Sequence, residues 1–429
     1  MSERDTYRLL HALEETVKTG DLTIETPDKL QYHFGKLGTT PKGIMQVRNP
    51  AFFSHAMSGR DPMLVLGEGY MHEEWVTPGN DIASVIGVLL ENDVHGRLMH
   101  SRNRCRTWIQ HLFARMQHAN TGRWAENIWR HYDYPAAFYE QFLSEDMGYT
   151  CGFGEQGDTS EQYQTQKNER VCCKLGLANV PEEQRRVADL GCGFMSFGRH
   201  AAREHNAQVT GITLSPVQHS YATERNQRDG LDDRITPLHG DYRSLEGKFP
   251  FVTSIGMVEH VHNRGYREFF RTVKSLLAQG GTALVHTIGS TDKPKVPVNE
   301  FTHRYIFPGS RLARLDELTL AARESALQVL NMENLGTHYA ETLKHWREKF
   351  EAHIPQIQKI DPKVFNDVFI RMWRFYLASS EAGFRHSALQ LYQVLLSHDG
   401  EWPKQVPKDL DFGRALVGAG DRASEISSS

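Results

Sequence analysis

This sequence of 429 residues has few cysteines and no long apolar run, and neither sign of charge dominates it. The five cysteines show neither zinc-ligand spacing nor a disulfide framework, so we predict no metal site. An alternative set, Glu259 with His260 and His262, lacks a further ligand cluster. The net charge of −4 argues against a nucleic-acid partner. With no membrane-spanning run and no secretion signal, we expect a cytoplasmic protein.

The clearest positive signal is the segment Val187–Phe194, where apolar residues and Asp189 lead into two glycines. We interpret it as a buried parallel strand that ends in a tight turn before a helix. Gly191 and Gly193 carry no Cβ, so the backbone can approach a ligand closely there. The order acid-x-Gly-x-Gly resembles the first motif of S-adenosylmethionine (SAM)-dependent methyltransferases. A dinucleotide fingerprint fits less well, because the third glycine is displaced to Gly198. A strand–helix turn of another α/β protein is the alternative.

From residue 187 onward, segments of strand and helix character alternate. We expect strands at 187–190, 208–214, 235–239, 252–257 and 282–287, and helices at 199–205, 216–229 and 266–278. This alternation predicts an α/β fold with a doubly wound, mostly parallel, Rossmann-like sheet. Ligands of such sheets bind beyond the carboxyl ends of the strands. Those ends carry Gly191, Gly193, Thr213, Asp241, Glu259 and His286.

The flanking regions differ from this alternation. We divide the chain into a smaller N-terminal α+β domain (1–125), a catalytic domain with helical insertions (126–400) and a polar tail (401–429). In the first domain we expect a helix at 5–18, short strands at 30–34 and 43–48, and an amphipathic helix at 82–99. Further helices are expected at 161–175, 311–326, 340–352, 365–378 and 388–397. The stripe of Trp373, Phe375 and Tyr376 indicates a helical core, with a lipid groove as the alternative.

A set of short motifs follows in order along the chain. They are His131-Tyr-Asp, Tyr149-Thr-Cys-Gly, Asp189-Leu-Gly-Cys-Gly, Gly211-Ile-Thr-Leu-Ser, Gly240-Asp-Tyr-Arg, Gly256-Met-Val-Glu-His-Val, Val285-His-Thr-Ile-Gly, Tyr305-Ile-Phe-Pro-Gly, His338-Tyr-Ala-Glu-Thr-Leu and Glu381-Ala-Gly-Phe-Arg. This set resembles the cyclopropane fatty acid synthase family, which includes the mycolic acid cyclopropane synthases. Two earlier segments, Arg48-Asn-Pro-Ala-Phe-Phe and Leu66-Gly-Glu-Gly-Tyr-Met, look like the extra domain of the bacterial phospholipid enzymes. That domain implies a homodimer.

The resemblance implies a reaction and a set of site residues. A methyl group would pass from SAM to a cis double bond of a phospholipid acyl chain, and bound bicarbonate would deprotonate the resulting carbocation so that a cyclopropane ring closes. The implied cofactor residues are Tyr149, Thr150, Asp189, Gly191, Cys192, Gly193, Thr213, Gln218, Asp241 and Tyr242. The implied catalytic, bicarbonate-binding residues are Glu259, His286, Tyr339, Cys151 and Ser380. For each of these the alternative is a turn, cap or core role.

Two departures from the family pattern keep other outcomes open. Ser380 stands where the family usually has cysteine, and the segment 194–198 replaces a Trp-Gly-Gly run. A methylene- or methyl-branched acyl chain is therefore a rival product of the same methyl transfer. A lipid- or SAM-binding homologue without catalysis is a third hypothesis. The substrate class implies a peripheral enzyme at the inner membrane surface.

Overall fold

The computed structural model describes residues 2–94, 96, 134–261, 265–290, 299–398 and 402–406. The chain divides into two compact units, each assembled from separate stretches of sequence. Unit 1 comprises Met1–His131, Lys293–Ser310 and Leu343–Leu389, and unit 2 comprises Tyr132–Asp292, Arg311–Thr342 and Gln390–Ser429. The chain therefore contributes to each unit more than once, and the linear boundaries at residues 125 and 400 stay predictions.

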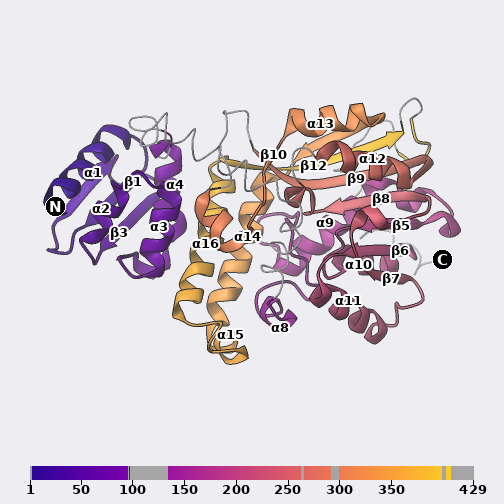
Figure 1. Cartoon of the computed structure of the whole chain (residues 1–429), viewed down its shortest axis with the longest axis horizontal. Helices are drawn as coiled ribbons and strands as arrows, with labels where there is room; N and C mark the ends of the chain where they lie inside the picture. The colour runs from indigo at the N-terminus through magenta and orange to yellow at the C-terminus, as the bar shows by residue number, and fades with distance from the viewer. Residues whose placement is uncertain are drawn as a thin grey trace, which may run out of the picture. The chain divides into compact units, whose positions relative to one another are not determined.

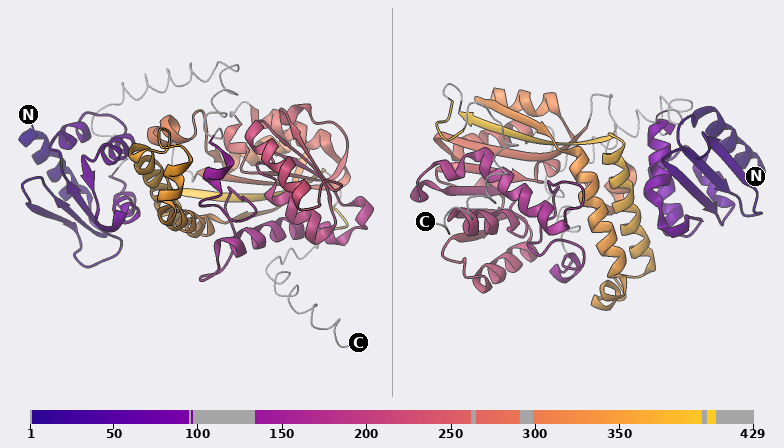
Figure 2. Two further views of the ribbon diagram at one scale, coloured as in Figure 1. Left: turned by 90° about the horizontal axis from the view of Figure 1, so that it is seen from below. Right: turned by 180° about the vertical axis from the view of Figure 1, so that it is seen from behind.

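Unit 1 contains a small mixed sheet and several helices (Figure 2). Its strands are β1 (Asp21–Glu25), β2 (Gln31–Gly35), β3 (Lys42–Val47) and β4 (Trp75–Val76), and its helices are α1 (Ser2–Thr16), α2 (Ala51–Ala56), α3 (Pro62–Met71), α4 (Ile82–Glu91), α15 (Ile354–Ile360) and α16 (Asp367–Arg385). The strand order is β2-β1-β3-β4, with β1 antiparallel to β2 and parallel to β3. An N-terminal α+β region is thereby confirmed. The aromatic stripe of α16 is buried, which confirms its interpretation as a helical core.

Unit 2 is built on an eight-stranded sheet with the order β11-β12-β9-β8-β5-β6-β7, and β10 pairs with β9 (Figure 1). The strands are β5 (Arg186–Leu190), β6 (Gln208–Thr213), β7 (Ile235–His239), β8 (Phe249–Ile255), β9 (Leu277–Ser290), β10 (Ala313–Arg314), β11 (Leu327–Asn334) and β12 (Leu389–His398). The pairings from β7 through β6, β5 and β8 to β9 are all parallel, whereas β11 and β12 are antiparallel. The predicted mostly parallel sheet is confirmed.

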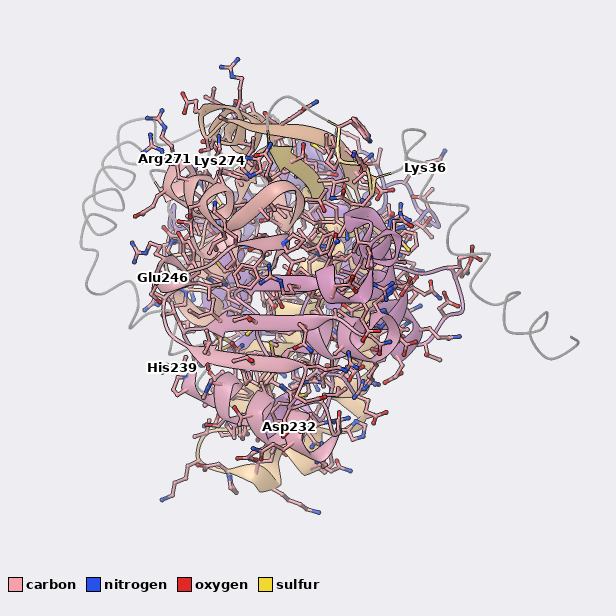
Figure 3. All side chains as sticks on the ribbon, turned by 90° about the vertical axis from the view of Figure 1, so that its right-hand side faces the viewer. Lys36, Asp232, His239, Glu246, Arg271 and Lys274 are labelled. Carbon is pink, nitrogen blue, oxygen red and sulfur yellow. The ribbon has the colours of Figure 1, made fainter. Side chains whose placement is uncertain are left out.

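Helices cover both faces of this sheet (Figure 1). They are α8 (Ala136–Tyr139), α9 (Ser160–Leu175), α10 (Ser196–His205), α11 (Pro216–Arg228), α12 (Tyr266–Leu276), α13 (Leu315–Glu324) and the first part of α14 (Gly336–Ala352). Because successive residues of a strand point to opposite faces, Val187 packs with α9 and α10 while Ala188 packs with α12 and α13. Charged residues such as Asp232 and Arg271 lie on the outside of this unit (Figure 3). The sheet is thus doubly wound.

Local sequence explains where the helices around the glycine loop begin and end. Helix α9 starts with a capping box, in which Thr159 and Gln162 exchange hydrogen bonds, and ends at Gly176 with φ of +76°. The Ser215 hydroxyl accepts from the Gln218 amide at the start of α11, and Pro216 follows at the first helical position. These signals fix the two helices that flank the strand-end edge of the sheet.

Several predicted elements need correction. The helix predicted to run from residue 82 to 99 ends at Glu91. The helix predicted at 388–397 is wrong, because this segment is strand β12, buried on both faces and therefore without the alternation that marks a half-exposed strand. The helix predicted from residue 311 begins only at Leu315, since Ala313 and Arg314 pair with β9. The strand predicted to reach Met257 ends at Ile255, because Gly256 turns the chain with φ of +71°.

Candidate active site

The candidate site lies at the carboxyl ends of the central strands of unit 2. Strand β5 pairs with β6 on one side and with β8 on the other, so the chain winds away from β5 in both directions. In open parallel sheets the loops on either side of such a switch point leave a crevice for a ligand. The loops after β5 and β8 are the ones that carry the glycine motif and Glu259.

The structure favours glycine at the two motif positions for different reasons. Gly191 has φ of +77°, and a Cβ there would come within 2.5 Å of the Met257 side chain. Gly193 has φ of +55°, but a Cβ there would meet no heavy atom within 4 Å. The amides of Gly191 and Cys192 both donate to the Ile212 carbonyl, at 2.9 and 3.0 Å. Gly191 is therefore required by packing, whereas Gly193 borders open space.

Asp189 is buried at the end of β5 and accepts a hydrogen bond from the Thr253 hydroxyl at 2.9 Å. Burial raises the pKa of Asp189 to about 6, although the Thr253 bond and the nearby Lys167 ammonium lower it. Burial in turn lowers the pKa of Lys167 to about 8. Asp189 thus ties β5 to β8 beneath the glycine loop, and its direct contact with a cofactor stays a prediction.

The segment of Tyr149 and Thr150 lies against the loop after β8. The Thr150 carbonyl accepts from the Gln164 amide at 2.8 Å, and a Cβ on Gly256 would lie 2.7 Å from the Thr150 methyl group. Tyr149 packs against Tyr139, with ring centroids 5.6 Å apart. The structure therefore brings this predicted cofactor segment to the same strand-end edge as the glycine loop.

The residues predicted to bind ribose contact each other. The Thr213 hydroxyl donates to the Gln218 side-chain oxygen at 2.7 Å, and both residues are buried. The Thr213 carbonyl accepts from the Gly240 amide at 2.9 Å, which joins the ends of β6 and β7. A ribose hydroxyl at this position would find two polar side chains already held in place.

Asp241 and Tyr242, two further residues of the predicted cofactor site, have structural roles in this fold. The Asp241 carboxylate accepts from the Arg243 amide and guanidinium, at 2.9 and 2.6 Å, and the Arg243 hydrogen bonds hold its pKa below the usual range. Tyr242 is buried against Phe269, with ring centroids 5.8 Å apart. The alternative turn and core roles thus describe both residues here, and their contact with adenine stays a prediction.

Glu259 follows the end of β8, whereas His286, predicted at a strand end, lies inside the neighbouring strand β9, which continues to Ser290. Each has one buried polar atom that has no hydrogen-bond partner among the described residues. Glu259 Oε1 accepts from the Ile288 amide at 2.6 Å, while Oε2 is unpaired. Burial raises the pKa of Glu259 to about 7, although the Ile288 bond lowers it. His286 sits opposite Ile255, the last residue of β8. A shared site for the carboxylate and the imidazole stays a prediction.

The protonation of His286 follows from its neighbours. Its Nδ1 lies 3.2 Å from the Gln393 side-chain nitrogen, and in the tautomer that accepts a hydrogen bond from this nitrogen the imidazole proton sits on Nε2. Burial lowers the pKa of His286 well below its usual range, and the Lys167 and Lys174 ammonium groups lower it further. His286 is therefore neutral and presents a buried N–H donor without a partner in the described structure.

Cys151 and Tyr339 are joined through the start of α14. The Cys151 thiol donates to the Gly152 carbonyl at 3.0 Å and lies 3.8 Å from the Leu335 carbonyl, whose oxygen also accepts from the Tyr339 amide. Burial raises the pKa of the Cys151 thiol well above its usual range, so it is a thiol rather than an attacking thiolate. Tyr339 is buried. Both residues contribute to unit 2.

Ser380 belongs to unit 1, where it is half-buried on α16. The site geometry above is that of unit 2, so a role for Ser380 stays a prediction. Phe194, the other departure from the family pattern, is buried in the glycine loop between Tyr139 and Tyr221, at 5.4 and 5.3 Å between ring centroids. The larger side chain is thus packed into an aromatic cluster.

Known proteins share this fold and sequence. The model of the family described as mycolic acid cyclopropane synthetase matches residues 119–394, well over half of the chain. The chain belongs to this family. A probable fatty acid methyltransferase of Pseudomonas putida is 34% identical over 295 residues, covering 66% of this chain and 73% of the relative. The cyclopropane-fatty-acyl-phospholipid synthase of Escherichia coli K12 is 30% identical over 377 residues, covering 85% and 90%.

Solved structures resemble this chain in fold. The cyclopropane synthase MmaA2 from Mycobacterium tuberculosis superposes with a TM-score of 0.57 at 22% identity, covering 63% of this chain and 97% of that one. The predicted family, fold class and enzyme class are confirmed: the chain is a SAM-dependent lipid methyltransferase of the cyclopropane synthase family. Among the residues that the structure describes, no helix has the length and apolar character of a membrane span.

Several residues that shape the site were not predicted from sequence. Gln393, Thr253, Gln164 and Lys167 orient or charge the predicted residues from other elements of the unit. Gln393 lies on β12, which the sequence pattern had indicated as a helix. Only the assignment of that strand beside β9 would have placed its amide next to His286.

Proposed function

We propose that this chain transfers the methyl group of SAM to the cis double bond of an unsaturated phospholipid acyl chain, and that the product is a cyclopropane ring. The observation that carries the proposal is the pair of buried atoms, Glu259 Oε2 and His286 Nε2, left unpaired in the described structure. The name of the Escherichia coli relative, cyclopropane-fatty-acyl-phospholipid synthase, supports the same reaction.

The residues present fit two small molecules. Bound SAM would supply an electrophilic methyl group, and bound bicarbonate would supply a base. The open space beside Gly193 allows a ligand to approach the loop backbone. We assign the methionine part of SAM to Tyr149 and Thr150 with the loop Gly191, Cys192 and Gly193 above Asp189, the ribose to Thr213 and Gln218, and the adenine to Asp241 and Tyr242.

The chain's own groups can perform the proton step. An anion bound where β8 ends beside β9 would accept hydrogen bonds from His286 Nε2 and from the Tyr339 hydroxyl. The backbone around Cys151 would also line this anion site. Glu259, with a pKa near 7, can accept a proton at its unpaired Oε2. Because these groups are buried, water is excluded and each electrostatic contact is strengthened.

An alkene is a weak nucleophile, so the chain must hold the acyl double bond in line with the methyl donor. The cation that follows needs stabilisation by aromatic faces or negative charge. Tyr139, Tyr149 and Phe194 form an aromatic cluster in contact with the glycine loop, and Glu259 supplies a carboxylate. These groups suit the electrostatics of a reaction that passes through a carbocation.

A second candidate product is a methylene- or methyl-branched acyl chain. Two observations favour it: Ser380 stands where the family usually has cysteine, and Phe194 fills part of the glycine loop. The Pseudomonas putida relative is named a probable fatty acid methyltransferase, which leaves the product of that enzyme unspecified. The methyl transfer from SAM is the same for each product, and the methyl-branched product additionally needs a hydride donor to reduce the carbocation.

The deciding experiment uses purified enzyme, methyl-labelled SAM and vesicles of a phospholipid with cis-monounsaturated chains. Mass spectrometry should show acyl chains heavier by one labelled CH₂, with no double bond reducible by hydrogenation. Removal of bicarbonate from the buffer should slow product formation, and its return should restore the rate. A labelled product that retains a reducible double bond would replace cyclopropanation with methylene branching. A saturated product with a branched-chain fragmentation pattern, formed only when a hydride donor is added to the assay, would replace it with methyl branching.

We further propose that the enzyme is a homodimer that binds the inner membrane surface from the cytoplasm, because its substrate chains lie in the bilayer. Vesicle flotation should recover the protein with anionic phospholipid vesicles, and light scattering on a size-exclusion column should give twice the chain mass. Failure to float, or a monomer mass, would remove the corresponding part of this proposal without affecting the chemistry.

A further inference from the structure

A second cluster of chemically active side chains lies between α9 and α10, and the methyl-transfer chemistry does not use it. Cys172 of α9 and His200 and His205 of α10 bring one sulfur and two ring nitrogens within 4.8 Å of one another. Glu169, one helical turn before Cys172, joins them: its Oε2 lies 3.0 Å from His200 Nε2 and 2.9 Å from His205 Nε2. All four residues belong to unit 2.

We propose that Glu169, Cys172, His200 and His205 form a zinc site that clamps α9 to α10. One thiolate, two imidazoles and one carboxylate are ligands that zinc prefers, whereas magnesium and calcium prefer oxygen alone. The charges also balance, since one thiolate and one carboxylate neutralise a divalent cation. Four protein ligands leave no open position, so the site would be structural rather than catalytic.

The spacing of the donor atoms is close to that of a tetrahedral zinc site. Zinc bonds of about 2.0–2.3 Å place ligand atoms roughly 3.3–3.8 Å apart. The nitrogen–oxygen distances of 2.9 and 3.0 Å lie slightly below that range, and the widest separation in the Cys172 group reaches 4.8 Å. Glu169 is not one of the three residues of that group, so its carboxylate and the Cys172 sulfur must approach each other by side-chain rotation before all four atoms reach the spacing that a zinc ion requires.

A metal ion can reach the cluster from the surface, and its binding would release a proton. Cys172 is fully buried, but the side chain of Glu169 is 25% exposed, so the cluster reaches the surface at the carboxylate. Binding of Zn²⁺ would release the Cys172 proton and replace the two imidazole–carboxylate hydrogen bonds with metal bonds through Nε2. Each imidazole would then carry its proton on Nδ1.

The position of the cluster gives the clamp a function. Helix α10 begins three residues after Gly193, and α9 carries Gln164, whose amide holds the Thr150 carbonyl. A metal between these helices would fix the glycine loop relative to the Thr150 segment without touching either ligand-binding region. The inference does not rest on the proposed reaction, because its test uses metal binding and not product formation.

The test is a cobalt and zinc titration of the full-length protein. Wild type should bind one equivalent of Co²⁺ with a tetrahedral visible spectrum and a near-ultraviolet thiolate charge-transfer band, and Zn²⁺ should displace the cobalt. C172S should lose the charge-transfer band and lower zinc affinity at least tenfold in competition with a chromophoric chelator. The matched control is C173S, which changes the neighbouring thiol at 3.3 Å from Glu169 Oε1 and should bind as wild type does.

Other outcomes would overturn the proposal. If zinc does not bind stoichiometrically, or if C172S binds it as tightly as wild type, the cluster is a hydrogen-bonded helix contact only. H205Q provides a second variant in case C172S does not fold, and it should also lower zinc affinity at least tenfold. Zinc should raise the melting temperature of wild type and C173S by a few degrees but not that of H205Q, because only a ligand that binds the folded state stabilises it.

Discussion

The two halves of the strand-end edge in unit 2 differ in whether their buried polar groups are hydrogen-bonded within the protein. On the side of β5, β6 and β7, the polar side chains are paired within the protein: Thr213 with Gln218 and Asp189 with Thr253. On the side of β8 and β9, Glu259 Oε2 and His286 Nε2 are buried without partners in the described structure, as is the Ser254 hydroxyl. Gln164 Oε1, beside the start of α10, is also unpaired in the described structure, so the first half differs from the second in degree.

This difference indicates which half the ligand must complete. A buried polar atom without a hydrogen bond costs about 1–3 kcal/mol, so the fold is less stable here than it could be. Such groups persist where function requires them. We call the side of β5, β6 and β7 the cofactor half, because the proposed SAM site lies there, and the side of β8 and β9 the Glu259 half. In our proposal SAM would meet side chains that are already positioned, whereas the Glu259 half should depend on a small polar ligand.

The largest effect on activity is expected from a substitution in the Glu259 half. Glu259→Gln keeps the size and the hydrogen bond to Ile288 but removes the proton acceptor at Oε2. We expect the rate of product formation to fall by about 10²–10⁴-fold, the range for loss of a positioned acid–base group. The dissociation constant for SAM, measured by calorimetry, should stay within twofold of wild type. Activity within threefold of wild type would place the proton acceptor elsewhere or support a non-catalytic binding role.

The same substitution should increase stability. Burial raises the pKa of Glu259 from 4.5 to about 7, so between these values the unfolded chain ionises while the folded chain does not. Ionisation therefore favours unfolding as pH rises through this window. Glu259→Gln removes the effect, and its free energy of unfolding should exceed that of wild type by about 1–3 kcal/mol above pH 7, with the gap closing below pH 4.5.

Urea unfolding of both proteins across that pH range measures the gap. Glu381→Gln is the matched control, because Glu381 is a buried carboxylate paired with Arg347 at 2.9 Å and Arg385 at 3.2 Å. Its substitution should destabilise the protein at neutral pH, since it breaks those ion pairs. A Glu259→Gln protein that is equally or less stable at pH 8 would mean that Oε2 has a partner in solution.

Substitutions of the two glycines in the cofactor half should separate an effect on SAM binding from an effect on stability. Gly193→Ala adds a methyl group where no atom lies within 4 Å, so it should cost about 1 kcal/mol in backbone strain but weaken SAM binding about tenfold. Gly191→Ala places its Cβ 2.5 Å from Met257 and should mainly lower stability. Calorimetry with SAM and thermal unfolding distinguish the two effects. Equal SAM affinity in Gly193→Ala would move the cofactor away from this part of the loop.

The sequence predicted the cofactor half better than the Glu259 half. The glycine loop follows a short apolar strand and precedes a helix, so local pattern alone placed it correctly. The environment of His286 depends on Gln393 from β12, a strand buried on both faces that lacks any alternation. Propensity could not distinguish that strand from a helix, because tertiary burial decides the outcome.

The same limit applies to the Cys172 cluster. Its ligands form two local pairs, Glu169-x2-Cys172 and His200-x4-His205, which have the spacing of zinc-finger ligands, but a carboxylate stands where such a motif has a second cysteine and strand β5 lies between the pairs. Packing of α9 and α10 on the same face of the sheet brings them together. Contacts that arise from helix packing, unlike strand-end positions, are not encoded in a short motif.

The smallest effect is expected at Asp241. Its carboxylate is held by Arg243 and is 29% exposed, so a contact with the adenine amine would add little to an existing pair. Asp241→Asn keeps the side-chain oxygen that accepts from the Arg243 amide, and it should raise the dissociation constant for SAM about threefold with little change in melting temperature. An unchanged affinity would show that Asp241 only caps its turn. Recognition of adenine would then lie with backbone groups near β7. The cofactor half would in that case depend on its loops more than on charged side chains.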